Sequence, residues 1–174
     1  IFAYRTIDGR GIWDESLTAG NAFRGGAGLN NIAARPIITK GMVVSMSVSG
    51  KIAAFKLING ELVWSRKISG QETTADSGDN LFLIDSQNRL VALRLSNGKT
   101  FWEKELPGGL WMGPVLAGGR LIAVSAEGTV LNLNVSDGNT LSQFDLGNDI
   151  ASAPVIASGT VYFLTKGANL IAMR

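Results

Sequence analysis

The sequence predicts an all-β protein, a β-propeller built from four-stranded antiparallel blades. Three observations predict this fold. Hairpin-type turn dipeptides recur about every 40 residues, which is the period of a propeller blade. Tryptophans follow these turns at a fixed distance, and short apolar runs rich in β-branched residues lie between them. Because the three features share one period, we interpret the chain as one supersecondary unit repeated several times.

The recurring turns are four dipeptides, each lying between two strand-like runs: Asp8-Gly9, Asn59-Gly60, Asn97-Gly98 and Asp137-Gly138. Asp-Gly and Asn-Gly are strong hairpin signals because glycine adopts positive φ without steric cost. The turn glycines Gly9, Gly60, Gly98 and Gly138 are spaced 51, 38 and 40 residues apart. The spacing therefore predicts one such hairpin in each repeat.

The tryptophans keep the same register as the turns. Trp13, Trp64 and Trp102 each follow their turn glycine by four residues, whereas the fourth repeat has Ser142 at this position. A large ring at one fixed place in every repeat is typical of packing between neighbouring units. We therefore predict that these tryptophans and the four turn glycines dock one blade on the next, rather than stack on a cofactor.

The apolar runs predict four strands per repeat, and in the second repeat they cover about 36–39, 42–48, 51–57 and 61–67. Near-continuous apolar stretches such as residues 81–84 suit a propeller, because neighbouring blades cover both faces of a blade. A β-sandwich is the competing architecture, but it gives no reason for a fixed spacing from glycine to tryptophan. The predicted organisation is the end of one blade at 1–17, full blades at 35–67, 73–106 and 113–146, and an incomplete last blade at 152–174.

Composition excludes several other classes. The formal net charge is only +2, and Lys and Arg are scattered, so the sequence carries no nucleic-acid footprint. The chain has no cysteine and no histidine, which removes thiolate and imidazole metal sites. No apolar run approaches the ~20 residues that span a bilayer. The chain begins inside an apolar pattern at Ile1 with no signal peptide or lipid-attachment cysteine, so we expect it to be a fragment.

Three repeats resemble the quinoprotein tryptophan-docking motif, Ala-x-Asp-x-x-x-Gly-x-x-x-Trp. The matching segments run from Ala3 to Trp13, Ala54 to Trp64 and Ala92 to Trp102. The chain departs from the motif at its Asp position, where Arg5, Lys56 and Arg94 stand. In the fourth repeat Asn132, Asn134 and Ser142 replace the Ala, Asp and Trp, and the glycine is kept. Over essentially its whole length the chain is similar to the BamB family of PQQ-repeat propellers, whose members also stop after a strand like residues 170–174.

The resemblance implies an eight-bladed ring, of which about four blades are present. In the family the last blade lacks its outer strand, and the N-terminal segment of the chain supplies it. The resemblance further implies a non-enzymatic scaffold subunit of the outer-membrane β-barrel assembly (BAM) complex, at the periplasmic face of the outer membrane of a Gram-negative bacterium. Its partner would be the barrel-forming, BamA-like subunit, bound through inter-blade loops. Membrane association would come only from a lipid anchor outside this fragment.

The alternative function is a PQQ-dependent dehydrogenase or a quinone-sensing propeller fragment. The alcohol dehydrogenases that share this repeat hold their quinone with an adjacent-cysteine disulfide, a carboxylate base and a Ca²⁺ ligand set. This chain has no cysteine, and most of its carboxylates fall at predicted turns. We therefore predict no catalytic, cofactor-binding or metal residue. Asp76 and Asp85 lie in or at the end of strand-like runs and could face the central channel, but we expect them to be structural.

Two stretches are candidates for partner binding. The insertion Thr18 to Arg35 is rich in Gly and Asn and also carries Phe23, Arg24 and Leu29, and long loops on rigid scaffolds are often functional. In the resembling family the residues just before Pro36 dock the barrel-forming subunit with an Asp-x-Asp pair. The matching residues here are Asn31, Ile32 and Ala33, so the acidic pair is absent. The open alternative is a loop that simply folds over the blade.

The second candidate is Leu110-Trp111-Met112, in the connection from Pro107 to Gly113, because Trp111 lies outside the docking register. Capping of the blade core is the alternative reading of this tryptophan. A half-ring also leaves two apolar blade faces and unpaired strand edges. Two copies of the fragment are therefore expected to be able to pair as a homodimer.

Overall fold

The computed structural model describes residues 1–17, 34–48, 50–70 and 74–174. Within these residues the elements are all β-strands, and they form five antiparallel sheets of consecutive strands. The sheets contain, in order, β1 (Phe2–Tyr4) and β2 (Gly11–Asp14); β3 (Ile37–Thr39), β4 (Met42–Ser47), β5 (Lys51–Lys56) and β6 (Leu62–Arg66); β7 (Ala75–Ser77), β8 (Asn80–Ile84), β9 (Arg89–Arg94) and β10 (Thr100–Glu105); β11 (Trp111–Ala117), β12 (Arg120–Ser125), β13 (Thr129–Asn134) and β14 (Thr140–Asp145); and β15 (Val155–Ala157), β16 (Thr160–Leu164) and β17 (Leu170–Met173).

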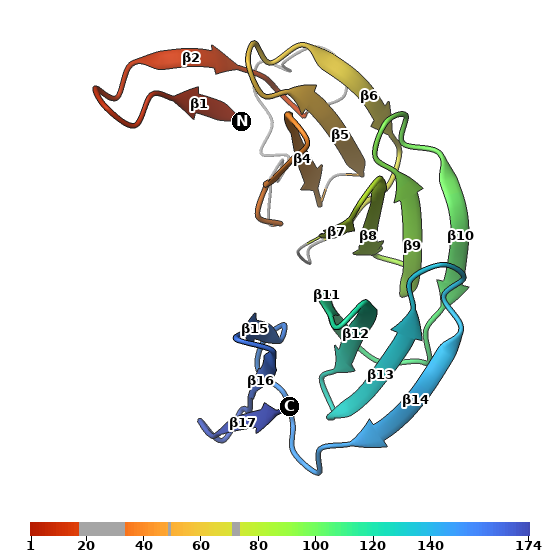
Figure 1. The fold of residues 1–174 in the computed structure, drawn as a ribbon. Coiled ribbons are helices and arrows are strands. Elements are labelled where there is room, and N and C mark those ends of the chain that lie inside the picture. Colours follow the sequence, from red (N-terminus) through yellow and green to blue (C-terminus); the bar gives the residue numbers. More distant parts are fainter. Residues whose placement is uncertain (18–33, 49, 71–73) are drawn as a thin grey trace, which may run out of the picture.

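The sheets follow one another around an open arc (Figure 1), with strands β7 and β11 toward its inside and β10 and β14 along its outer rim. Each of the three complete sheets is a four-stranded meander of neighbouring strands. This arrangement confirms the predicted all-β propeller fold. The four strands β3 to β6 lie within the ranges expected from the turns of the second repeat.

The four predicted hairpins share one local structure. In each, the side chain of the Asx residue accepts a hydrogen bond from the backbone N–H two residues later, as between Asn59 Oδ1 and Glu61 N at 3.1 Å. The following glycine has a positive φ, for example +73° at Gly60. A side-chain acceptor and a left-handed glycine are both provided within four residues, so the turn forms from local sequence alone.

The hydrophobic core lies between the sheets. Leu81 and Leu83 pack against the sheet β3–β6, whereas Phe82 and Ile84 of the same strand pack against the sheet β11–β14. All four side chains are fully or almost fully buried. Each such side chain contributes on the order of 1.5–3 kcal/mol by leaving water. The continuous apolar run of this strand therefore follows from coverage on both faces, as the sequence predicted.

Candidate functional site

Each docking tryptophan has an alanine as its cross-strand neighbour in its own sheet. Ala3 pairs with Trp13, Ala54 with Trp64 and Ala92 with Trp102. Each indole N–H then donates to a backbone carbonyl of the next sheet: Trp13 to Leu57 at 2.8 Å, Trp64 to Leu95 at 2.6 Å and Trp102 to Val135 at 3.1 Å. One indole thus bridges two neighbouring sheets in each of three places. We call these places the inter-blade slots.

The turn glycines form the other wall of these slots. A Cβ added to Gly98 would lie 2.5 Å from the Trp64 ring, and one added to Gly60 or Gly138 would lie 2.8 or 2.9 Å from the ring of Trp13 or Trp102. Such distances are shorter than real carbon contacts, which optimise near 3.5–4.0 Å. Each of these glycines contacts the tryptophan of the preceding repeat. The repeated spacing therefore places glycine and tryptophan for contact between successive repeats. Gly9, the first turn glycine, has nothing within 4 Å of the same position.

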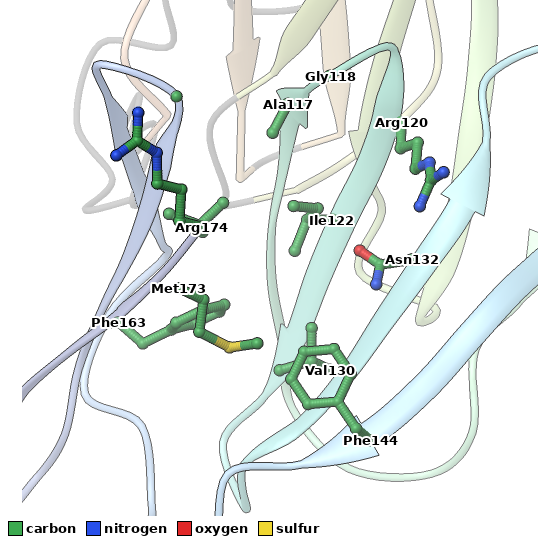
Figure 2. A pocket seen from close by; sticks show the side chains of 12 residues that line it. Ala117, Gly118, Arg120, Ile122, Val130, Asn132, Phe144, Phe163, Met173 and Arg174 are labelled. Atoms are coloured by element: carbon green, nitrogen blue, oxygen red, sulfur yellow. The ribbon is translucent and has the colours of Figure 1, made fainter.

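The fourth slot is different, because Ser142 stands in place of the tryptophan. Asn132 is its cross-strand partner and donates from Nδ2 to Ser142 Oγ at 2.8 Å. A cavity of about 330 Å³ opens here between the sheets β11–β14 and β15–β17. Figure 2 shows Phe144 on one side of it and Phe163 and Met173 on the other. The sequence showed the missing tryptophan, but the space that its absence leaves is visible only in the structure.

The two carboxylates that were considered for the central channel have structural partners. Asp85 is buried, and its Oδ1 accepts from the backbone N–H groups of Gln87 and Arg89, both at 2.9 Å. Its Oδ2 accepts from the Arg89 guanidinium at 2.7 and 2.9 Å. The hydrogen bond to Asp85 raises the pKa of Arg89 above its ordinary value. Asp85 therefore closes the turn between β8 and β9.

Asp76 joins two sheets. Its Oδ2 accepts a hydrogen bond from the Thr39 hydroxyl at 2.8 Å. Beside it, the Lys40 ammonium donates to Asp79, which lies in the corresponding turn of the next sheet. In the part of the chain that the structure describes, no group of three or more Asp and Glu side chains is placed to hold a metal ion. Over the same residues, no helix is long and apolar enough to cross a membrane.

The structure corrects the second partner-binding candidate. Trp111 and Met112 begin strand β11 and are only 2% and 5% exposed, so the expectation that they lie in a surface connection is wrong. Trp111 packs in the core between the third and fourth sheets and donates from Nε1 to the Pro107 carbonyl at 2.8 Å. The large apolar side chain that this connection exposes is Leu110, at 61%. The sequence pointed to all three residues together, because adjacent apolar residues give no sign of which one faces the core.

The first partner-binding candidate falls outside the described residues. This applies to all six of its named side chains: Phe23, Arg24, Leu29, Asn31, Ile32 and Ala33.

The connections between the later sheets gather at one end of the strands, together with the turns between second and third strands. Ala126 N donates to the Leu110 carbonyl at 2.8 Å, and Ile150 N donates to the Ala126 carbonyl at 2.8 Å. The Asn88 side chain also donates to the Gly109 carbonyl. We call this end of the molecule the connection face. Its backbone hydrogen bonds hold successive connections to each other as one surface.

The two end sheets leave apolar side chains exposed. Phe2, Tyr4 and Ile12 are exposed on the first sheet, and Val155, Leu164 and Leu170 are exposed on the last. Large exposed apolar surfaces mark interaction sites or aggregation hazards. The expected pairing of two copies through these ends remains a prediction.

Meander sheets that dock through an indole on the turn glycine of the next sheet define a β-propeller of the quinoprotein-repeat class. A family model described as outer membrane protein assembly factor BamB matches residues 1–104 and 97–174. The chain therefore belongs to the BamB family.

Individual relatives agree with this assignment. BamB of Alkalilimnicola ehrlichii is 30% identical over 116 residues, which are 66% of this chain and 30% of that protein. BamB of Escherichia coli (strain K12) is 25% identical over 115 residues, 66% of this chain and 29% of that protein. The crystal structure of BamB from Moraxella catarrhalis superposes with a TM-score of 0.82 at 20% identity, covering 98% of this chain and 50% of that one. The chain thus spans about half the length of this solved relative.

Proposed function

We propose that the chain forms part of a non-enzymatic scaffold subunit of the outer-membrane β-barrel assembly complex, at the periplasmic face of the outer membrane. The observation that carries this proposal is the family match, which extends along the whole chain. The relatives named above are assembly factors, and the docking motif that the chain shares with quinoproteins is used here for packing between blades.

The proposed partner is the barrel-forming, BamA-like subunit, and its proposed contact is the connection face. Rigid blades hold the connections in place, which is how many scaffolds present binding residues. Leu110 supports this assignment because it is an exposed aliphatic side chain on a connection whose backbone is fixed by hydrogen bonds. The insertion with Phe23 and Arg24 is proposed to contribute to the same contact, since an aromatic residue beside an arginine is common in binding hot spots.

The test is site-specific photocrosslinking in cells that make the protein. A photoreactive amino acid replaces Leu110 in one strain and Phe23 in another. The matched control is Ile58, an equally aliphatic residue that is 80% exposed on a turn at the opposite end of the strands. We expect an adduct with the barrel-forming subunit from positions 110 and 23 and none from position 58.

Two results would contradict the proposal in different ways. Adducts from position 58 alone would show that the partner binds the opposite face. If all three positions give no adduct with the barrel-forming subunit, while the protein is made and folded, the assembly role itself is refuted.

A further inference from the structure

The cavity in the fourth inter-blade slot occupies the place that an indole fills in the earlier slots. In the slot that Trp64 fills, the wall formed by the next sheet contains the cross-strand pair Leu81 and Leu93. The pair at the same place in the last sheet is Val161 and Met173, and both line the cavity. The match of strand register identifies the cavity as an unfilled tryptophan slot.

The wall of the cavity formed by the sheet β11–β14 corresponds to the same wall in the other slots, but it carries a polar pair. Asn132 stands opposite Ser142, where the earlier sheets have alanine opposite tryptophan. Its Nδ2 is already bonded to the serine hydroxyl, so its amide oxygen remains an acceptor at the cavity wall. Figure 2 shows this oxygen on the side of Ile122. A ring N–H placed in the cavity would therefore find an acceptor, which here is a side chain of the sheet β11–β14 and not a backbone carbonyl of the next sheet.

The size and lining of the cavity suit a planar ring. Its volume of about 330 Å³ exceeds the ~150 Å³ of an apolar engineered cavity that binds benzene. Its lining is mainly aliphatic and aromatic, with Val130, Phe144 and Phe163 among the side chains. Unlike that engineered cavity it opens to solvent, so a polar substituent on the ring can remain in water.

Two arginines lie at the rim of the cavity. Arg120 and Arg174 both line it, and Figure 2 shows their side chains on its two sides. Within the described residues, neither guanidinium forms an ion pair. An anionic substituent at either side of the cavity would therefore meet a guanidinium that has no ion-pair partner among the described residues.

We propose that the fourth inter-blade slot binds a planar aromatic acid, with the aromatic ring in the position of the missing tryptophan and the acidic group at the arginine rim. This site is independent of the proposed assembly role. The probe that matches it is indole-3-acetate, which combines the ring of the filled slots with a carboxylate.

The methionine methyl groups provide a direct assay on the unmodified 174-residue chain. Its four methionines give four ¹³C-methyl signals, and only Met173 lines the cavity. Met42 and Met46 belong to strand β4, pack in the core between the sheets β3–β6 and β7–β10, and serve as internal controls. Titration with indole-3-acetate is expected to shift the Met173 signal to saturation and to leave Met42 and Met46 unchanged. Shifts that do not saturate, or an unmoved Met173 signal, would overturn the proposal.

Charge preference is tested with the cation tryptamine, which has the same ring. Because the rim arginines are exposed, we expect tryptamine to bind about two- to fivefold more weakly than the acid, and Arg120→Gln to remove part of this difference. Equal binding of the two probes would refute the role of the rim. A Met173 signal that changes on dilution of the chain alone would show that a second copy covers the cavity, and would also overturn the proposal.

Refilling the slot from within provides the matched variants. Asn132→Ala combined with Ser142→Trp restores the alanine–tryptophan pair of the other sheets and is expected to abolish the ligand-induced shift of Met173. Ser96→Trp adds the same ring at an exposed turn and is expected to bind the acid as the unmodified chain does. Undiminished binding in the refilled variant would show that the ligand lies elsewhere. The titration of the unmodified chain decides the question if the refilled variant does not fold.

Discussion

Replacing Gly98 by alanine tests whether the turn glycines are required by contact between sheets. Gly98 has a φ of +67°, and an added Cβ would lie 2.5 and 2.7 Å from two carbons of the Trp64 ring. This indole is only 7% exposed and is held by its hydrogen bond to the Leu95 carbonyl. The ring therefore has little freedom to move away from the new methyl group.

Two costs add in this variant, and a second glycine separates them. Gly41 has a similar φ of +74° but nothing within 4 Å of its Cβ position. Gly41→Ala therefore measures the backbone cost alone, about 1–2 kcal/mol for an L-residue in the left-handed region. Gly98→Ala adds the cost of overpacking against a fixed ring, about 1–3 kcal/mol. We expect a total loss of about 2–5 kcal/mol for Gly98→Ala.

The free energy of unfolding is measured by urea denaturation, followed by far-ultraviolet circular dichroism so that the signal does not depend on the environment of Trp64. Both variants should unfold with the slope of the parent chain and a lower midpoint. If Gly98→Ala and Gly41→Ala lose equal stability, the turn glycine is required only by its own φ. The inference that glycine and tryptophan are coupled between sheets would then be wrong.

Two further predictions concern charged groups. The hydrogen bond and charge of Lys40 lower the pKa of Asp79 below its ordinary value of 3.8. The ion pair therefore stabilises the fold above pH 3.8, and this stabilisation is lost as the pH falls through the lower pKa of the folded state. Lys40→Met should therefore be less stable than the parent near neutral pH, and the difference should disappear in acid; a difference that persists at the acid end of a urea series would contradict this. Asp85→Ala removes the partner of Arg89 and the acceptor of two backbone N–H groups, and is expected to cost about 2–4 kcal/mol. Asp85→Asn keeps an acceptor for the backbone and should cost clearly less, whereas equal losses in the two variants would contradict the turn-closing role.

The repeated features of the fold could be predicted because their causes are local. An Asx acceptor, a left-handed glycine and a tryptophan four residues later lie within a short segment, and the structure shows the same hydrogen bond at each turn. The apolar strand from Leu81 to Ile84 was also predictable, since burial on both faces leaves a continuous hydrophobic signature. The backbone carbonyl that accepts from each indole N–H could not be predicted, because it lies more than thirty residues further along the chain.

The candidate sites could be predicted less well. Trp111 and Leu110 are adjacent apolar residues, and only the packing of β11 against the preceding sheet decides that the first is buried and the second exposed. Asp85 lies at the end of a strand, and its direction follows from the position of Arg89 after the turn. The deciding neighbour is the preceding sheet for Trp111 and the residue across a turn for Asp85, and composition and periodicity specify neither.

The sequence alone determined that this protein is a run of propeller blades, because period, turn chemistry and tryptophan spacing all depend on residues close in the chain. It also marked Ser142 as the break in the repeat. Only the tertiary structure decided what that break means, since a cavity exists when two sheets have been brought together and no side chain fills the space between them. The walls of that cavity come from residues far apart in sequence, so their shape and charge arise only once the sheets have packed.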